Sequence, residues 1–451
     1  MIIIASTILG ILAPIIFGLV LITLIARQTK FFLSEIFALS FALGVFFITM
    51  LIFIFSWLGL LLTLSVNILL ALLFLSIVFI ILRRVAVDSH INHKPNEQKI
   101  KLLTKILTII LFIIIAATII FVFFSAWWRP IIQYDALATW SLKAKIFFSQ
   151  NKIILNQDHP YFLGIHLLGY PLQLPLWQDW QSVLVGSWFE PAIKLTLPIY
   201  YLSLLIILYS ALRRTASRFR AMIFTFFLAT MPFVVYHARH DYADLILSFY
   251  VLATAIYFWR GWREENRGYF ILGAILAASA AWTKNEGLAL SIIILVSSLI
   301  YSLVKKKFRV KHLISAGLLI ALVLPWLIFK FSHHLSWANN ENSFKLIHSF
   351  GALSILFNRL IVISNWNIWW LIFILLIIFN WRSLWHRENS FLFFSVLGCL
   401  IFYLALYVFT DSNNYYLLVG VIDQRNLLTI APLTIFYGAL LFFGDYVKIE
   451  S

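Results

Sequence analysis

The chain has 451 residues, of which 63% are hydrophobic and only 12% are charged. This composition excludes an ordinary soluble globular protein. The net charge of +16 does not indicate nucleic acid binding, because most basic residues fall in alternate segments between apolar stretches, the distribution that sets membrane topology. We therefore expect an integral membrane protein with membrane lipids around it and no nucleic-acid partner.

Apolar stretches close to the roughly 20 residues that span a bilayer recur along the whole chain. They predict an all-α polytopic membrane protein with about 13 transmembrane helices. The stretches lie at 2–26, 31–56, 58–82, 105–125, 192–212, 219–236, 243–260, 269–282, 288–304, 313–332, 366–381, 390–410 and 427–444.

The N-terminal part has a different character from the rest. Residues 1–82 contain three apolar stretches with almost no polar content, and residues 83–104 are the most polar stretch. No basic residue precedes the first apolar stretch, whereas Arg27 and Lys30 follow it, so we expect an uncleaved span with its N-terminus outside. This topology makes 83–104 a cytoplasmic linker and 445–451 a short cytoplasmic tail.

The longest predicted external loop covers residues 126–191. It contains an apolar stripe at helical spacing, formed by Trp177, Trp180, Leu184 and Trp188. Gln178, Asp179 and Gln181 lie on another face of the same predicted helix. This pattern is typical of a helix in the membrane interface, where Trp is favoured, and equally of a helix that packs against the bundle. Residues 351–364 are expected to form a second interfacial helix.

Three clusters of acidic and basic residues stand at the ends of apolar stretches. They contain Asp135 with Lys143 and Lys145, then Arg239, His240, Asp241 and Asp244, and then Lys284 with Glu286. A carboxylate at the edge of a membrane span is costly to desolvate unless it is paired or used. Alternating the spans from an external N-terminus brings all three clusters to the external face. We therefore predict that they assemble into one site.

These motifs resemble the GT-C class of integral-membrane glycosyltransferases, in particular the branch of protein O-mannosyltransferases and lipid A aminoarabinose transferases. In chain order they are Tyr134-Asp135-Ala136-Leu137 with Trp140 and Lys143-Ala144-Lys145, Tyr170-Pro171, Tyr242-Ala243-Asp244-Leu245, Lys284-Asn285-Glu286-Gly287, and Arg425 before a last span with Pro432. The resemblance covers about 105–444, the predicted catalytic module, and leaves 1–82 as additional N-terminal spans. Family members often carry two adjacent acids where this chain has Asp135 alone.

The resemblance implies a glycosyltransferase that moves a monosaccharide from a polyprenyl-phosphate donor to a glycan, lipid or protein acceptor with inversion. Asp135 is the predicted catalytic base. The predicted substrate-binding residues are Lys143, Lys145, Asp241, Asp244, Lys284, Glu286, Arg425, His159 and Tyr170. No cofactor is implied, and a single acid at the first motif makes a metal site less expected. The implied location is a bacterial-type plasma membrane, with the site facing outside.

Simpler roles remain open for several of these residues. Asp135 could be a solvated loop residue, and Asp241 could cap a helix. Lys143 and Lys145 could set topology, and Lys284 could form an internal ion pair with Glu286 or Asp244. If 135–147 is a regular helix at ~100° per residue, the two lysines project about 80° to either side of Asp135.

Two other function classes fit a polytopic chain. A transporter or flippase would show inverted-repeat symmetry and charges near the middle of its spans, and the sequence shows neither. A lipid-linked glycan ligase or polymerase would favour a long late external loop rich in Arg and His. The late loops 333–350 and 411–426 are short, so the transferase is the preferred prediction.

Overall fold

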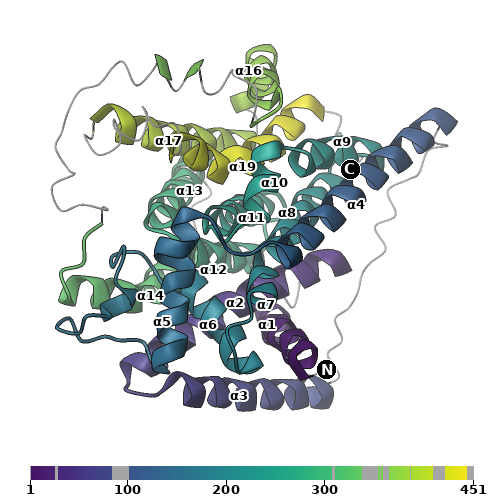
Figure 1. Ribbon diagram of the computed structural model, residues 1–451. Coiled ribbons are helices and arrows are strands. Elements are labelled where there is room, and N and C mark those ends of the chain that lie inside the picture. The colour runs from purple at the N-terminus through teal and green to yellow at the C-terminus, as the bar shows by residue number, and fades with distance from the viewer. Residues whose placement is uncertain are drawn as a thin grey trace.

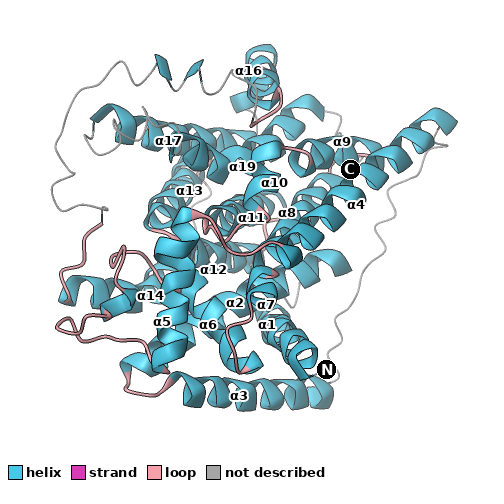
Figure 2. Ribbon diagram, viewed as in Figure 1, coloured by secondary structure: helices cyan, strands magenta, loops and turns pink. Residues whose placement is uncertain are grey.

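The computed structural model describes residues 2–25, 29–83, 101–306, 310–337, 354–355, 357–358, 365–385, 388–409 and 422–443. Within these ranges the chain forms helices joined by loops, so the predicted all-α architecture is confirmed (Figures 1 and 2). The α-helices are Ile2–Ile25 (α1), Leu33–Trp57 (α2), Leu62–Arg83 (α3), Leu102–Trp128 (α4), Ser141–Gln150 (α5), Gln173–Val185 (α6), Glu190–Lys194 (α7), Thr196–Arg213 (α8), Arg218–Ala229 (α9), Pro232–His237 (α10), Asp244–Arg263 (α11), Arg267–Thr283 (α12), Asn285–Val304 (α13), Val310–Ser332 (α14), Trp369–Phe379 (α16), Asn389–Phe409 (α17) and Ile422–Phe443 (α19). A π-helical turn covers Ala136–Trp140 (η1), and 3-10 helices cover Phe162–Gly164 (η2) and Trp381–Trp385 (η3).

Among the described residues, nine helices are long and apolar enough to cross a membrane, and the chain is a multi-pass membrane protein. The predicted total of 13 spans is not confirmed. Leu62–Ile77 and Trp369–Phe379 are shorter apolar helices, and α12 has 17 residues. The predicted span 219–236 is divided into α9 and α10 because Pro232 begins the second helix, and a proline disfavours helical continuation through the residues before it.

Helix α11 lies at the centre of the bundle (Figure 1). Every residue from Asp244 to Trp262 is buried, and the helix packs against α12, α8 and α19. Twenty residues at about 1.5 Å each give a length of about 30 Å, the thickness of the hydrocarbon core. Polar groups at the two ends of α11 therefore belong to opposite ends of the bundle.

The N-terminal helices are part of this bundle. Helix α1 crosses α2 closely, because a Cβ at Gly18 would lie 1.9 Å from the Ser40 backbone O, and a Cβ at Gly44 would lie 1.9 Å from the Pro14 O. Such small residues let two membrane helices approach to backbone contact. Helix α2 also packs against α8 and α6, so it contributes to the protein core.

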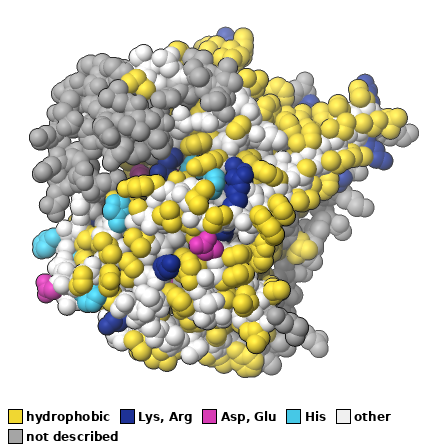
Figure 3. Space-filling view, viewed as in Figure 1, with side chains coloured by type: hydrophobic (Ala, Val, Ile, Leu, Met, Phe, Trp, Pro, Cys, Tyr) yellow, Lys and Arg dark blue, Asp and Glu magenta, His cyan; other side chains and the backbone are white. Residues whose placement is uncertain are grey.

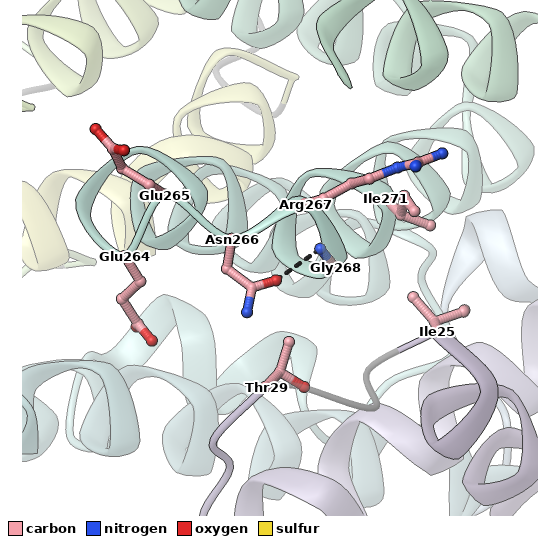
Figure 4. A pocket seen from close by; sticks show the side chains of 8 residues that line it. All are labelled: Ile25, Thr29, Glu264, Glu265, Asn266, Arg267, Gly268 and Ile271. Carbon is pink, nitrogen blue, oxygen red and sulfur yellow. Dashed lines mark hydrogen bonds between the residues drawn. The ribbon is translucent and has the colours of Figure 1, made fainter. Parts of the chain in front are cut away.

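A buried ion cluster lies at the end of α11 that is opposite to Asp244. Glu35 of α2 accepts hydrogen bonds from Arg260 at 2.9 Å, Arg214 at 2.5 Å and Tyr257 at 2.6 Å. A nearby pocket of about 590 Å³ is lined by Ile25, Thr29, Glu264, Glu265, Asn266, Arg267, Gly268 and Ile271, and Figure 4 shows the Asn266 side chain accepting a hydrogen bond from the Gly268 N–H. The ion pairs of Glu35 with Arg214 and Arg260 connect α2 with the end of α8 and with α11.

The segment 126–191 is folded, with η1, α5, η2, α6 and α7 following one another. Trp177 and Trp180 of α6 are buried, and their indole N–H groups donate to Thr196 Oγ1 at 2.6 Å and to the Gly10 O at 3.2 Å. The polar face with Asp179 is buried as well. Helix α6 is thus enclosed by protein on both faces, as in the bundle-packing interpretation. Three predicted segments lie wholly or mostly outside the described residues. They are the tail 445–451, the interfacial helix 351–364 and the linker 83–104.

Candidate active site

Asp135 lies where the first long external segment turns into a helix. Helix α4 ends at Trp128, two residues before Pro130, because proline cannot continue the ladder of backbone hydrogen bonds. Asp135 then precedes the π-helical turn η1. Its side chain is 30% exposed, so its carboxylate is accessible from outside the bundle.

The guanidinium group of Arg425, near the start of α19, joins this carboxylate to a second one. Its Nη1 donates to Asp135 Oδ2 at 2.5 Å, and its Nε and Nη2 donate to Asp244 Oδ2 at 3.1 and 2.7 Å. The Arg425 guanidinium also lies over the ring of Tyr242, 4.8 Å from the ring centroid. The planar group is thereby held by two carboxylates and an aromatic face.

Asp244 begins α11 and is fully buried. An acidic residue in the first turn of a helix is favoured by the helix dipole. Besides Arg425, Lys284 donates to Asp244 through its Nζ at 3.0 Å, and His237 Nδ1 lies 4.0 Å from Asp244 Oδ2. Burial lowers the pKa of His237 to about 3, so this histidine is neutral and the charge of Asp244 is balanced by Arg425 and Lys284.

Lys284 occupies a sharp corner between two buried helices. Helix α12 ends at Thr283 and α13 begins at Asn285, so Lys284 alone forms the connection, with φ −151° and ψ 157°. A Cβ at Gly287 would lie 2.0 Å from the Ala280 O, so glycine is needed where α13 crosses α12. The corner turns Lys284 toward Asp244, with Glu286 Oε1 3.4 Å from the same Nζ. These two carboxylates raise the pKa of Lys284 against the opposite effect of its burial.

Five residues thus form one connected ion network, which we call the carboxylate–cation cluster. It consists of Asp135, Arg425, Asp244, Lys284 and Glu286. Tyr170 lies near enough that Glu286, Lys284, Arg425 and Asp244 all affect its pKa, which burial raises. The Tyr170 ring packs edge-on against Trp140. The structure therefore brings six of the ten predicted site residues together.

The other four predicted residues lie apart from this cluster. Lys143 is buried and its Nζ donates to the Leu167 O at 3.0 Å, while the exposed Lys145 lies 6.0 Å over the ring centroid of Trp188. His159 accepts a hydrogen bond from the backbone N–H of Tyr161 at 3.0 Å. None of these three contacts involves a member of the carboxylate–cation cluster.

Asp241, the fourth, belongs to a second buried polar group that the sequence did not reveal. Asp241 accepts a hydrogen bond from Gln178 of α6 at 3.3 Å. Burial raises the pKa of Asp241 to about 7, against the effect of the nearby Lys194. Asp179, adjacent to Gln178, is also fully buried, and its burial raises its pKa. In the sequence, the one sign of this buried group was that Gln178 and Asp179 share a polar face of the Trp-rich helix.

The cluster has the elements that a transfer reaction on a phosphate-linked substrate requires. Arg425 and Lys284 are cations in a poorly hydrated place, where their attraction for an oxyanion is strong. Asp135 is the carboxylate that is most open to a reactant. Among the residues that the structure describes, no group of three or more His, Cys, Asp or Glu side chains is arranged to hold a metal ion.

The fold is of the GT-C type, which confirms the expected resemblance at the level of the fold. Two similar solved structures are those of ArnT from Cupriavidus metallidurans, one in the apo state and one bound to undecaprenyl phosphate. Each shares 15% sequence identity with this chain and superposes with a TM-score of 0.52 over 72% of it. The matches cover 58% and 59% of the ArnT chains, less than two thirds of their length. No protein-family model and no curated protein matches the sequence.

Proposed function

We propose that this protein is a membrane glycosyltransferase that transfers a monosaccharide from a polyprenyl-phosphate donor to an acceptor hydroxyl at the extracytoplasmic face. The observation that carries the proposal is the position of Asp135, a partly exposed carboxylate bonded to the same guanidinium group that holds the buried Asp244. The GT-C-type fold supports the same function, and one of the two ArnT structures is bound to undecaprenyl phosphate.

The proposed reaction is a single displacement. The acceptor hydroxyl oxygen attacks the anomeric carbon of the donor sugar and forms the new glycosidic bond with inversion. The bond between that carbon and the phosphate oxygen breaks, and its electron pair leaves with the polyprenyl phosphate. Asp135 takes the hydroxyl proton as general base, while Arg425 and Lys284 stabilise the negative charge of the leaving phosphate.

The charges of the cluster require a rearrangement when the donor binds. Three carboxylates face two cations, so the five side chains together do not favour another anion. The bond between Arg425 and the exposed Asp135 is the one that a phosphate oxygen replaces at the lowest cost, because both bonds to the buried Asp244 can stay. Donor binding would thus free Asp135 to act as a base in the same step that places phosphate on Arg425.

The proposed extracytoplasmic orientation follows from the charge distribution of the sequence. Arg260 and Arg263 lie at the end of α11 that is opposite to Asp244, and basic residues mark the cytoplasmic ends of spans. The cluster then lies at the external end. In this topology residues 105–444 carry the catalytic module, while α1 and α2 support it from the N-terminal side.

Donor binding tests this assignment. Purified protein in detergent is titrated with a polyprenyl-phosphate monosaccharide and the complex is followed by native mass spectrometry. Arg425→Gln and Lys284→Gln should each weaken binding by about tenfold or more, since each removes a charge-assisted contact. Lys145→Gln removes an equal charge outside the cluster and serves as the control. Equal affinity in all three variants would place the phosphate elsewhere.

A further inference from the structure

Two further cationic side chains, Arg129 and Arg239, lie by α4, outside the carboxylate–cation cluster. Arg129 caps α4, and the guanidinium of Arg239, which follows α10, lies 5.2 Å from the ring centroid of Phe121 on the same helix. Arg239 is half-buried, and its Nε is buried without a hydrogen-bond partner. Figure 3 shows Lys and Arg side chains beside α10 and the end of α4, with hydrophobic side chains around them and a His and an acidic side chain close by.

Among the described residues, no carboxylate neutralises either arginine. Burial lowers the pKa of Arg239, and the positive charge of Arg129 lowers it further. Burial and both arginines also lower the pKa of His240 to about 4, so His240 stays neutral. The charges of Arg129 and Arg239 thus interact unfavourably, and the Arg239 Nε is a buried N–H group without a hydrogen-bond partner. Both features favour the binding of an anion here.

The surface beside this place is suited to an acyl chain. Among the nine helices of the described residues that are long enough to span a membrane, α4 is the most exposed, with only 11% of its apolar stretch buried. Its last two turns present the exposed side chains of Phe121, Phe124 and Trp128, and the last two rings are stacked with centroids 6.1 Å apart. Tryptophan, here Trp128, is favoured at the level of lipid headgroups. A lipid whose phosphate met Arg129 and Arg239 would lay its chains along this face.

We propose that Arg129 and Arg239 bind the phosphate of an anionic membrane lipid, whose chains lie against the exposed face of α4. This site uses none of the five cluster residues and does not depend on the proposed transferase activity. Its ligand is a bilayer phospholipid that bears a net negative charge. The nearby acids Glu190 and Asp241 accept hydrogen bonds from the Ile131 N–H at 3.0 Å and from Gln178 at 3.3 Å, and both interact electrostatically with Lys194.

Native mass spectrometry of the full-length protein in detergent tests the site with phosphatidylglycerol as the probe. The double variant Arg129→Gln/Arg239→Gln should bind it at least about tenfold more weakly than the wild type, because two charge-assisted contacts are lost. Lys152→Gln removes a charge from an exposed position of the same external segment and should bind like the wild type.

Two further arms identify the ligand. Phosphatidylcholine, which has the same phosphate without net charge, should bind more weakly than phosphatidylglycerol. Inorganic phosphate, which has no chains, should not compete. Wild-type affinity in the double variant, or full competition by inorganic phosphate, would overturn the proposal. The variant Arg129→Lys/Arg239→Lys keeps both charges and controls for a folding defect. It should retain part of the affinity for phosphatidylglycerol. If it has the melting temperature of the wild type and still binds as poorly as the Gln double variant, recognition by charge is excluded.

Discussion

Arg425 donates to Asp135 and to Asp244 through separate nitrogens, so that one guanidinium group bonds to carboxylates 290 and 181 positions earlier in the chain. Asp244 is buried and accepts two hydrogen bonds from Arg425 on one oxygen, Oδ2, whereas Asp135 is 30% exposed and accepts one. The strength of these two contacts therefore differs. Asp244 fixes the position of Arg425, and Asp135 is the partner that a substrate can displace.

Removing the charge of Asp135 should abolish turnover and spare donor binding. Asp135→Asn keeps the shape of the side chain but cannot accept the acceptor proton, so the rate constant for transfer should fall about 10²-fold or more. Donor affinity should stay the same or increase, because a competing negative charge beside Arg425 is lost. Rate and affinity are measured separately by single-turnover transfer and native mass spectrometry. Asp158→Asn, at an exposed acid of the same segment, is the control, and near-normal turnover by Asp135→Asn would exclude the base.

The pairing of Arg425 with Asp244 should appear as a coupling energy. Arg425→Gln removes two of the hydrogen bonds to a buried carboxylate, and breaking a buried pair in this way costs about 3–5 kcal/mol of stability. Adding Asp244→Asn removes the unpaired charge and should restore part of the stability without restoring donor affinity. Thermal unfolding of the two single variants and the double variant in detergent gives the coupling. Strictly additive changes would show that the two side chains are not paired.

Lys143 should matter for stability and not for the donor, contrary to its predicted place in the site. Burial lowers its pKa to about 7, whereas an unfolded lysine titrates near 10.5. Between these values the unfolded chain holds a proton that the folded chain lacks, so the free energy of unfolding rises with pH from about 7 to about 10. Lys143→Met should lose this rise and keep donor affinity. A donor affinity reduced as strongly as in Lys284→Gln would contradict the observed geometry.

The sequence was sufficient to predict the members of the cluster that stand at the ends of apolar stretches. Asp135, Asp244 and Arg425 each interrupt a strongly hydrophobic pattern, and a charge in that position needs a partner. The number of spans could not be predicted equally well. Helix α12 is shorter than a usual span but is covered by other helices, and Pro232 breaks an apolar run that hydropathy alone treats as continuous.

The position of Lys143 depended on local geometry that the sequence does not display. A regular helix from 135 to 147 would have turned Lys143 about 80° from Asp135, within reach of a flexible side chain. The structure has the π-helical turn η1 immediately after Asp135, and this turn changes the angular phase of the residues that follow. Lys143 then points to the Leu167 O. The buried group around Asp241 was missed because its partner Gln178 lies in a helix whose polar face resembles a solvated one.

The choice between a lipid-linked donor and a soluble nucleotide sugar tests the proposed function most directly. The purified protein, supplied with an acceptor, is given either a polyprenyl-phosphate monosaccharide or the matching nucleotide sugar, and glycosylated acceptor is measured by mass spectrometry. We predict product only with the polyprenyl-phosphate donor, together with release of polyprenyl phosphate and loss of product in Asp135→Asn. Product from the nucleotide sugar alone, at a rate unaffected by Asp135→Asn, would contradict the proposed function.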